Sequence, residues 1–223
     1  RIEQERTEML AGISHDLRTP LARLRLESEM SVPDTDAREN MAADIAQVDS
    51  VISKFLDYAR PDHVSLHPIP LAPVVISSAR PFMGREDMHL EINITPEHWV
   101  MGDDVELARV VSNLLENARR YGASPVDGIT RVQISSQAHG RRIILSVRDA
   151  GRGVTPEQLV NLTRPFYRGD AARTSATGAG MGLSIVAKVI EHMGGTLEFR
   201  NSARGGLVAT IGLKRSGPRH RRE

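Results

Sequence analysis

The first 30 residues carry apolar side chains at intervals of three and four, the spacing of one face of an α-helix. This stripe consists of Leu10, Ile13, Leu17, Leu21 and Leu24. At about 100° per residue, His15 lies roughly 160° from the stripe, and Thr19 lies one turn further on, about 40° from His15. The pattern predicts a helix that buries its leucines and turns His15 toward solvent. Pro20 predicts a local bend beside His15, because it removes one backbone hydrogen bond.

A second amphipathic helix follows the break at residues 31–36. Asp36 and Glu39 resemble a capping box at its start. Its apolar positions alternate spacings of four and three, the pattern of heptad packing; they are Met41, Ile45, Val48, Ile52, Phe55 and Ala59. A single hairpin of two such helices cannot cover both apolar stripes. We therefore expect two copies of the chain to form a four-helix bundle.

After a proline-rich stretch the pattern changes to mixed helices and strands. We predict a helical domain over residues 1–60, a linker over 61–73, an α+β domain over 74–213 and a disordered basic tail over 214–223. The expected strands cover 89–94, 131–137, 142–149, 196–201 and 207–213, and the expected helices cover 72–83, 104–121 and 182–192. Such an order favours helices layered on one face of a mixed sheet.

Composition adds few constraints on function. With 29 Lys and Arg against 28 Asp and Glu, the net charge of +1 gives no indication of nucleic-acid binding. The absence of cysteine excludes a disulfide framework and a thiolate zinc site. No run approaches the roughly 20 apolar residues of a membrane span, and no signal peptide is evident. Because the chain begins at Arg1 within a helical pattern, we expect a fragment whose upstream part is missing.

Three short segments of the α+β region are candidates for nucleotide chemistry. Asn113 and Asn117 lie four residues apart on a helix, roughly 160° from its apolar stripe, which predicts an exposed pair of carboxamides. Their oxygens could hold magnesium or its waters, although an ordinary solvated helix face gives the same pattern.

The other two segments combine glycines with a strand end or a helix start. Asp149 is followed by Gly151 and Gly153, a pattern that either allows close ligand approach or is a common strand-to-turn transition. The segment 178–183 has glycines at 178, 180 and 182 before a helix, which fits either a phosphate-binding helix start or a flexible loop. Neither the P-loop spacing nor the dinucleotide-binding spacing is present there.

Taken in order, these segments resemble a bacterial sensor histidine kinase. Residues 14–21 (SHDLRTPL) are similar to the family's H box, 113–118 (NLLENA) to its N box and 149–153 (DAGRG) to its G1 box. Residues 165–168 (PFYR) are similar to the F box and 178–183 (GAGMGL) to the G2 box. The amino-acid sequences of residues 15–19, 118–122 and 168–170 resemble those of the EnvZ-like group. Ala150 and Ala179 depart from the residues more often seen in those boxes.

The resemblance implies a dimerising phosphotransfer hairpin followed by an α+β sandwich ATP-binding domain of the Bergerat (GHKL) type. It implies autophosphorylation of His15 with ATP and Mg²⁺, transfer to an OmpR-like response regulator, and regulator dephosphorylation. It also implies the cytoplasmic portion of a bacterial inner-membrane protein that functions as a homodimer, attached to the membrane through the missing upstream segment and binding no nucleic acid.

The resemblance also assigns roles to individual residues. His15 would accept the phosphoryl group, with Asp16 as base or orienter and Thr19 positioning water for regulator dephosphorylation. Asn113 and Asn117 would hold magnesium, and Asp149 would read adenine. The remaining expected nucleotide-binding residues are Arg120 near the phosphates, Tyr121 at the adenine, Gly151 and Gly153 in the G1 box, and Gly178, Gly180, Gly182 and Leu183 in the phosphate lid.

Three alternatives remain open from sequence. A non-kinase ATPase of the gyrase, chaperone or mismatch-repair kind would share the nucleotide pocket, but the hairpin with His15 argues against it. An inactive dimeric scaffold would bind regulator without transferring phosphate, but the intact boxes argue against that. A zinc site at His63 and His67 is disfavoured, because the flanking stretch is proline-rich and offers no further ligands.

Overall fold

The computed structural model describes residues 2–59, 64–167 and 180–218, and for residues 2–11, 14 and 15 it describes the backbone alone. The chain divides into two compact units, one comprising residues 1–61 with 165–181 and the other 62–164 with 182–223. The first is helical in its described part, and the second contains a sheet with helices against it.

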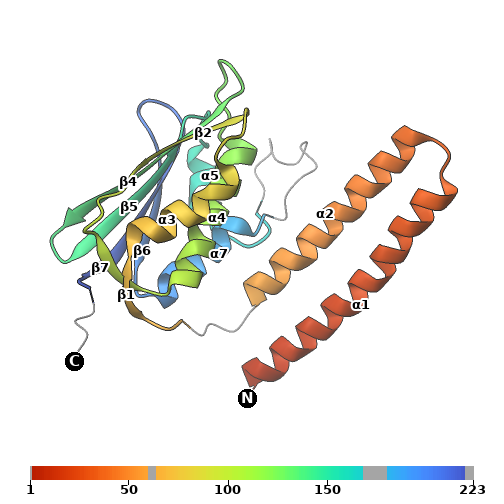
Figure 1. Ribbon diagram of the computed structural model, residues 1–223, viewed down its shortest axis with the longest axis horizontal. Coiled ribbons are helices and arrows are strands. Elements are labelled where there is room, and N and C mark those ends of the chain that lie inside the picture. Colours follow the sequence, from red (N-terminus) through yellow and green to blue (C-terminus); the bar gives the residue numbers. More distant parts are fainter. Residues whose placement is uncertain (1, 60–63, 168–179, 219–223) are drawn as a thin grey trace. The chain divides into compact units, whose positions relative to one another are not determined.

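The helical unit is a hairpin of α1 (Ile2–Ser31) and α2 (Thr35–Ala59), which lie side by side and antiparallel (Figure 1). Helix α1 continues through Pro20. The predicted capping box at Asp36 and Glu39 is wrong: α2 begins earlier, and Asp34 is the cap. Its Oδ1 accepts a hydrogen bond from the backbone N–H of Ala37 at 2.8 Å, which satisfies a donor of the first turn.

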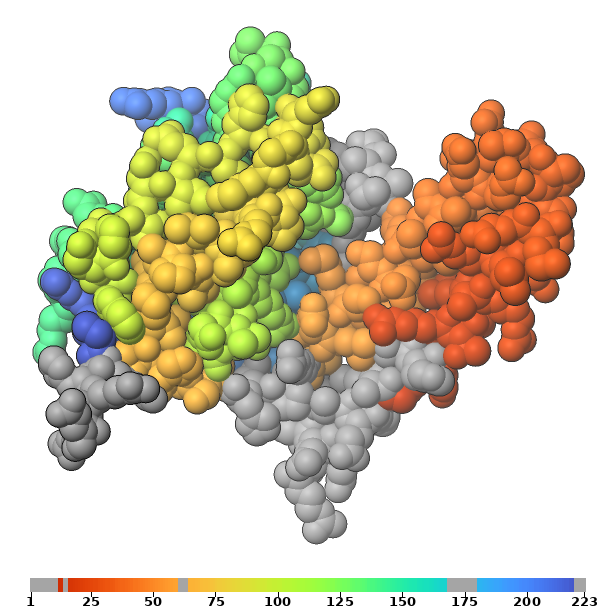
Figure 2. Space-filling view, in the orientation of Figure 1, coloured from red at the N-terminus to blue at the C-terminus, as the bar shows by residue number. Residues whose placement is uncertain are grey.

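Most of the apolar stripe of the hairpin is not buried by the hairpin itself. Ile13, Leu17 and Leu24 of α1 are exposed, and α2 contains no buried residue. The described side chains of the hairpin are coloured red to orange in Figure 2. The heptad pattern thus produces two parallel rows of apolar side chains that one copy of the hairpin leaves in contact with solvent, as expected for a half bundle.

The second unit is built on a seven-stranded mixed sheet. Its strands are β1 (His67–Pro70), β2 (Met88–Asn93), β3 (Trp99–Gly102), β4 (Thr130–His139), β5 (Arg142–Asp149), β6 (Thr196–Asn201) and β7 (Leu207–Ser216). The order is β1-β3-β7-β5-β4-β2, with β6 also paired to β7. Only the β2–β4 pair is parallel; the other pairs are antiparallel. Strand β7 is therefore the centre of the sheet, with β3, β5 and β6 as partners.

Helices cover one face of this sheet, as predicted (Figure 1). They are α3 (Leu71–Ala79), which continues into the short 3-10 helix η1 (Arg80–Phe82), α4 (Asp104–Tyr121) and α7 (Gly182–His192). Helix α4 packs between α3 and α7. Alternate residues of the central strands face these helices: Ile143, Leu145 and Val147 of β5 pair in register with Leu213, Ile211 and Ala209 of β7, and all six are buried. The short helix α5 (Pro156–Asn161) follows β5.

The sequence predicted α4, α7, β5 and β6 with their observed bounds, and it missed β1, β3 and α5. Strand β1 and the first residues of α3 lie inside the segment predicted as a linker. Strands β2, β4 and β7 begin or end up to three residues from their predicted bounds. The missed elements have four to six residues, too few for the periodicity to distinguish them from loops.

Candidate functional site

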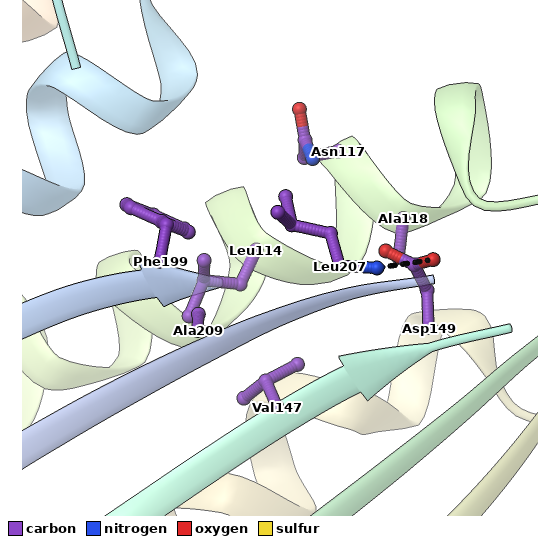
Figure 3. Close-up of a pocket in the computed structure, with 8 residues that line it drawn as sticks. All are labelled: Leu114, Asn117, Ala118, Val147, Asp149, Phe199, Leu207 and Ala209. Carbon is purple, nitrogen blue, oxygen red and sulfur yellow. Dashed lines mark hydrogen bonds between the residues drawn. The ribbon is translucent and has the colours of Figure 1, made fainter. Parts of the chain in front are cut away.

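Asp149 ends strand β5 and presents a buried carboxylate to the helix-covered side of the sheet. Its Oδ1 accepts hydrogen bonds from two backbone N–H groups, that of Gly151 at 2.9 Å and that of Leu207 at 3.1 Å. The second bond joins the end of β5 to the start of β7 and is drawn in Figure 3. Both bonds use the same oxygen, so within the described part of the chain Oδ2 is left as an acceptor for a ligand.

The surroundings of Asp149 disfavour its charged form. Burial raises the pKa of its carboxyl above the ordinary value, and the hydrogen bonds from Gly151 and Leu207 offset this only partly. A ligand that donates a hydrogen bond to the second oxygen of Asp149 would bind favourably. The cost of removing this carboxylate from water is already met in the folded chain.

Glycines allow the backbone to pack directly against Asp149. A Cβ at Gly122, just past α4, would lie 2.8 Å from the Cβ of Asp149, and a Cβ at Gly151 would lie 2.8 Å from the Cα of Gly122. Gly206 has φ +89°, and a Cβ there would overlap the carbonyl oxygen of Asp149. These close approaches fix the carboxylate between the end of α4 and the start of β7.

Asn201 fixes the loop that follows Asp149. Its Oδ1 accepts from the backbone N–H of Val154 at 3.0 Å, and its Nδ2 donates to the carbonyl oxygen of Val154 at 2.6 Å. The amide thus binds both polar groups of one residue, as a neighbouring strand would. Gly153, with φ +73°, leaves room for this contact, because a Cβ there would lie 2.6 Å from Asn201 Oδ1.

A pocket that is partly open to solvent lies between α4 and the sheet (Figure 3). It is lined by Leu114, Asn117, Ala118, Val147, Asp149, Phe199, Leu207 and Ala209. In Figure 3 the carboxylate of Asp149 and the ring of Phe199 lie at opposite ends of this row. An apolar slot with a carboxylate at one end suits a flat aromatic ligand that carries a hydrogen-bond donor.

The structure corrects the predicted exposure of the two carboxamides on α4. Asn113 is only 9% exposed, because Gly182 at the start of α7 packs beside it; a Cβ on Gly182 would lie 3.3 Å from Asn113 Oδ1. Its Nδ2 donates to the carbonyl oxygen of Arg109 at 2.9 Å, which orients the amide. Asn117, one turn on, lines the pocket. The pair therefore lies beside the cavity, where the sequence predicted a solvated face.

Arg120 and Tyr121, expected at the nucleotide, are not among the residues that line the pocket. Arg120 Nε donates to Glu116 Oε1 at 2.7 Å, and Arg119 donates to both carboxylate oxygens of Glu116. Burial opposes ionisation of Glu116, but these hydrogen bonds outweigh it and lower the pKa of the carboxyl to about 2. Tyr121 is 43% exposed and is not among the residues that line the pocket. Their roles toward a ligand stay predictions.

Replacing Glu116 by glutamine is expected to lower the free energy of unfolding at pH 7 by about 1–2 kcal/mol. The folded pKa of about 2 lies below the ordinary 4.5, so the ionised carboxylate stabilises the fold above about pH 4.5 and the effect is lost as the pH falls toward 2. Urea unfolding at pH 7 and pH 3 measures this, with the exposed Glu86→Gln as control. An equal difference between Glu116→Gln and the parent at both pH values would contradict the ion-pair account.

The glycine segment before α7 is described only from residue 180. Gly180 has φ +66°, and Gly182 is the first residue of α7. The side chain of Leu183 is buried in the core, so only its backbone could face a ligand. Gly178 lies outside the described residues. The backbone N–H groups at the start of α7 lie next to Asn113, which places a helix N-terminus beside the predicted magnesium position.

His15, Asp16 and Thr19 belong to α1, in the other unit. Asp16 and Thr19 are exposed, and the side chain of His15 lies outside the described residues. Among the described residues there is no group of three or more His, Cys, Asp or Glu side chains that could hold a metal ion. His63, half of the zinc alternative, lies outside the described residues. No described helix has both the length and the apolar character required to cross a membrane.

Known proteins share both parts of this arrangement. The profile of the "Histidine kinase-, DNA gyrase B-, and HSP90-like ATPase" family matches residues 102–217, and the "His Kinase A (phospho-acceptor) domain" profile matches residues 5–64. The chain belongs to the histidine kinase family. The second unit thus carries the ATPase-type fold, and the hairpin carries the phospho-acceptor match around His15.

Individual relatives are similar to this chain over most of its length. Sensor protein RstB of Escherichia coli is 35% identical over 209 residues, 89% of this chain and 46% of RstB. The histidine-protein kinase/phosphatase MprB of Mycolicibacterium paratuberculosis is 30% identical, over 91% of this chain and 41% of MprB. A solved structure of a mycobacterial MprB superposes with a TM-score of 0.58 at 29% identity, over 69% of this chain and all of that one. The chain spans less than half the length of RstB or MprB.

Proposed function

We propose that this chain transfers the γ-phosphoryl group of ATP to His15 and then to an aspartate of a response regulator. The observation that carries the proposal is the arrangement around Asp149, a buried carboxylate with one oxygen directed to an apolar pocket in a domain of the histidine kinase type. The match of the hairpin to the phospho-acceptor profile supports His15 as the acceptor.

The residues of the pocket fit an adenine nucleotide. Asp149 Oδ2 would accept a hydrogen bond from the exocyclic amine of the base, between Ala118, Leu207 and the other apolar lining residues. Asn113 and Asn117 would bind Mg²⁺ together with the phosphates, as few protein ligands are needed when phosphate oxygens complete the shell. The N–H groups at the start of α7 would face the phosphates. Bound Mg²⁺ would supply charge neutralisation at the transferred group.

The proposed reaction forms a phosphorus–nitrogen bond and breaks a phosphorus–oxygen bond. An imidazole nitrogen of His15 attacks the γ-phosphorus, and the β-phosphate oxygen leaves with the bonding electrons as ADP. Asp16 is placed next in sequence to orient the imidazole and to take up the ring proton. In the second step an aspartate oxygen of the regulator attacks the same phosphorus, and His15 leaves and regains a proton.

We propose that the working form is a homodimer that recognises an OmpR-like receiver domain. The exposed apolar rows of α1 and α2 support a second copy of the hairpin, because a four-helix bundle would cover Ile13, Leu17, Leu24 and Val48. The EnvZ-like sequence around His15 supports an OmpR-like regulator as the partner. In this proposal the chain is the cytoplasmic portion of a bacterial inner-membrane sensor, attached to the membrane by a segment upstream of it.

The two other functions considered from sequence are less well supported. A non-kinase ATPase of the same fold has no use for a hairpin that matches the phospho-acceptor domain. An inactive scaffold has no use for the glycine contacts that keep Asp149 accessible and oriented.

Incubation with γ-labelled ATP and Mg²⁺ tests the proposed function. We expect acid-labile, base-stable label on the chain and none on His15→Ala. A chain that binds ATP, measured with a fluorescent analogue, but takes up no label would contradict the kinase and favour the scaffold. ATP hydrolysis that persists in His15→Ala at the parental rate would favour the non-kinase ATPase.

Thr19→Ala is expected to leave the labelling of His15 within twofold and to slow dephosphorylation of the phosphorylated regulator at least tenfold. The physical reason is the position of Thr19, exposed and one turn from His15, where a hydroxyl can position an attacking water. Release of phosphate from a labelled OmpR-type receiver domain measures this, with Thr35→Ala at the start of α2 as control. Unchanged release would assign Thr19 a merely structural role.

A further inference from the structure

Arg18 links the two helices of the hairpin. Its Nε donates to Asp49 Oδ1 at 2.9 Å, and a terminal nitrogen donates to Ser53 Oγ at 2.6 Å. Asp49 and Ser53 lie four residues apart, so they occupy the same face of α2 on successive turns. The guanidinium therefore spans one turn of α2 and is held at a defined height along the hairpin.

This position along α1 is one helical turn from that of the proposed phospho-acceptor, His15. Arg18 follows His15 by three residues on the same helix, and residues at this spacing have Cβ atoms about 5–6 Å apart. A guanidinium has five N–H donors, of which two are used toward α2. Within the described residues the other donors make no hydrogen bond, and about half of the Arg18 side chain is exposed.

The ion pair with Asp49 is too exposed to be explained by stability alone. Both side chains are close to half exposed, and ion pairs of this kind contribute little to the free energy of unfolding. The geometry is better suited to orientation: the carboxylate and hydroxyl of α2 fix one edge of the guanidinium plane, and its other edge is left for an anion. Phosphate is the anion that this planar fork fits best.

We propose that Arg18 binds the oxygens of the phosphoryl group on His15, and that Asp49 and Ser53 are positioning residues that hold its guanidinium in place. This inference rests on the proposed phosphorylation of His15. Arg18 is then a catalytic residue, because it touches the transferred group, whereas Asp49 and Ser53 act through it. The covalent chemistry is unchanged: Arg18 offsets negative charge on the phosphoryl oxygens and exchanges no proton.

Two measurements on the full chain test this. The first is the initial rate of His15 labelling from ATP in the Arg18→Gln, Arg18→Lys and Asp49→Asn variants. We expect a loss of at least tenfold in Arg18→Gln, a smaller loss in Arg18→Lys, which keeps the charge without the fork, and a loss of about threefold in Asp49→Asn. Arg23→Gln and Asp44→Asn, exposed positions on the same two helices, are matched controls and should stay within twofold of the parent.

The second measurement is a pH titration of phospho-His15 by ³¹P NMR, which reads the phosphoryl group directly. Contact with Arg18 lowers the pKa of the phosphoryl group, so we expect the titration of Arg18→Gln to move to higher pH. Asp49→Asn keeps the guanidinium and should move less. A purely structural Arg18 would slow labelling through the fold without moving the titration of whatever phosphorylated protein remains.

The outcomes separate this inference from the proposed function. If the parent chain takes up no label, the proposed function fails. If the parent is labelled and Arg18→Gln shows the parental titration, Arg18 does not bind the phosphoryl group, whatever its labelling rate. If Asp49→Asn shows both the parental titration and the parental labelling rate, the positioning role of Asp49 is wrong.

Discussion

Asp149→Asn is expected to weaken the binding of ATP about 100-fold while leaving the protein as stable as the parent, or more stable. The asparagine oxygen can still accept from Gly151 and Leu207, so the local backbone is kept. The second oxygen becomes an NH₂ group that faces the donor of the base. Loss of a charge-assisted hydrogen bond and the donor–donor conflict together cost about 3 kcal/mol.

The expected stability has the opposite sign to that of a usual surface carboxylate. Burial raises the pKa of Asp149, so the folded state disfavours the ionised form, and at neutral pH the carboxylate lowers the free energy of unfolding. This cost is present at pH values above the raised pKa and disappears as the carboxyl becomes protonated on acidification. Asparagine removes it, and the melting temperature should stay the same or rise.

Calorimetric titration with ATP and with ITP measures the effect on binding. ITP carries a carbonyl oxygen in place of the amine, so the parent should prefer ATP strongly and Asp149→Asn should lose this preference. Asp104→Asn, at the exposed first turn of α4, is the control. Parental affinity for ATP in Asp149→Asn would contradict the role given to this carboxylate. A lower melting temperature in Asp149→Asn would also contradict it, because the loss of binding could then come from loss of the fold.

Gly206→Ala is expected to lower the free energy of unfolding by about 3 kcal/mol or more and to abolish nucleotide binding. Two costs combine at this position. The backbone has φ +89°, which an L side chain rarely adopts, and the new methyl group would overlap the carbonyl oxygen of Asp149. Relief of the overlap moves Leu207 away from Asp149 and breaks the hydrogen bond between them.

Gly84→Ala separates the two costs. Gly84 has φ +74°, and a Cβ there would meet nothing within 4 Å, so this variant carries the backbone cost without the overlap. We expect a loss of about 1 kcal/mol and unchanged ATP binding for Gly84→Ala. Urea unfolding compares the two variants. Equal losses would mean that the close approach of Gly206 to Asp149 contributes nothing.

The long periodic elements could be predicted from the sequence because local pattern and tertiary environment agree in them. Helix α4 has one face against the sheet, and its apolar stripe gave the observed bounds. Helix α7 and strand β5 are similar cases. Strand β1, by contrast, has the sequence HPIP, in which two of four residues are proline. It becomes a strand only because β3 offers a partner.

The site was predictable where one residue suffices and not where distant segments meet. Asp149 was a candidate because glycines follow it, and the family resemblance implied its role. Leu207, which donates to the same carboxylate from 58 residues away, could not be, because only the pairing of β5 with β7 brings them together. The adjacent Gly205 and Gly206 before an apolar strand were the available signal for a close backbone approach. Asn113 was predicted on an exposed face because the helix wheel carries no information about α7 above it.

Because β7 is central in the sheet, the proposed nucleotide site can form only late during synthesis of the chain. This strand is the last of the sheet in sequence, yet β3, β5 and β6 all pair with it. During synthesis, residues 99–102, 142–149 and 196–201 emerge before the strand that joins them, and Asp149 waits for the N–H of Leu207. Local helices can form as they leave the ribosome, but this domain can reach its folded state only after residues 207–216 have been made. A nascent chain shorter than this lacks the Leu207 N–H that binds Asp149, so the residues of the hairpin are made well before the proposed ATP site can be complete.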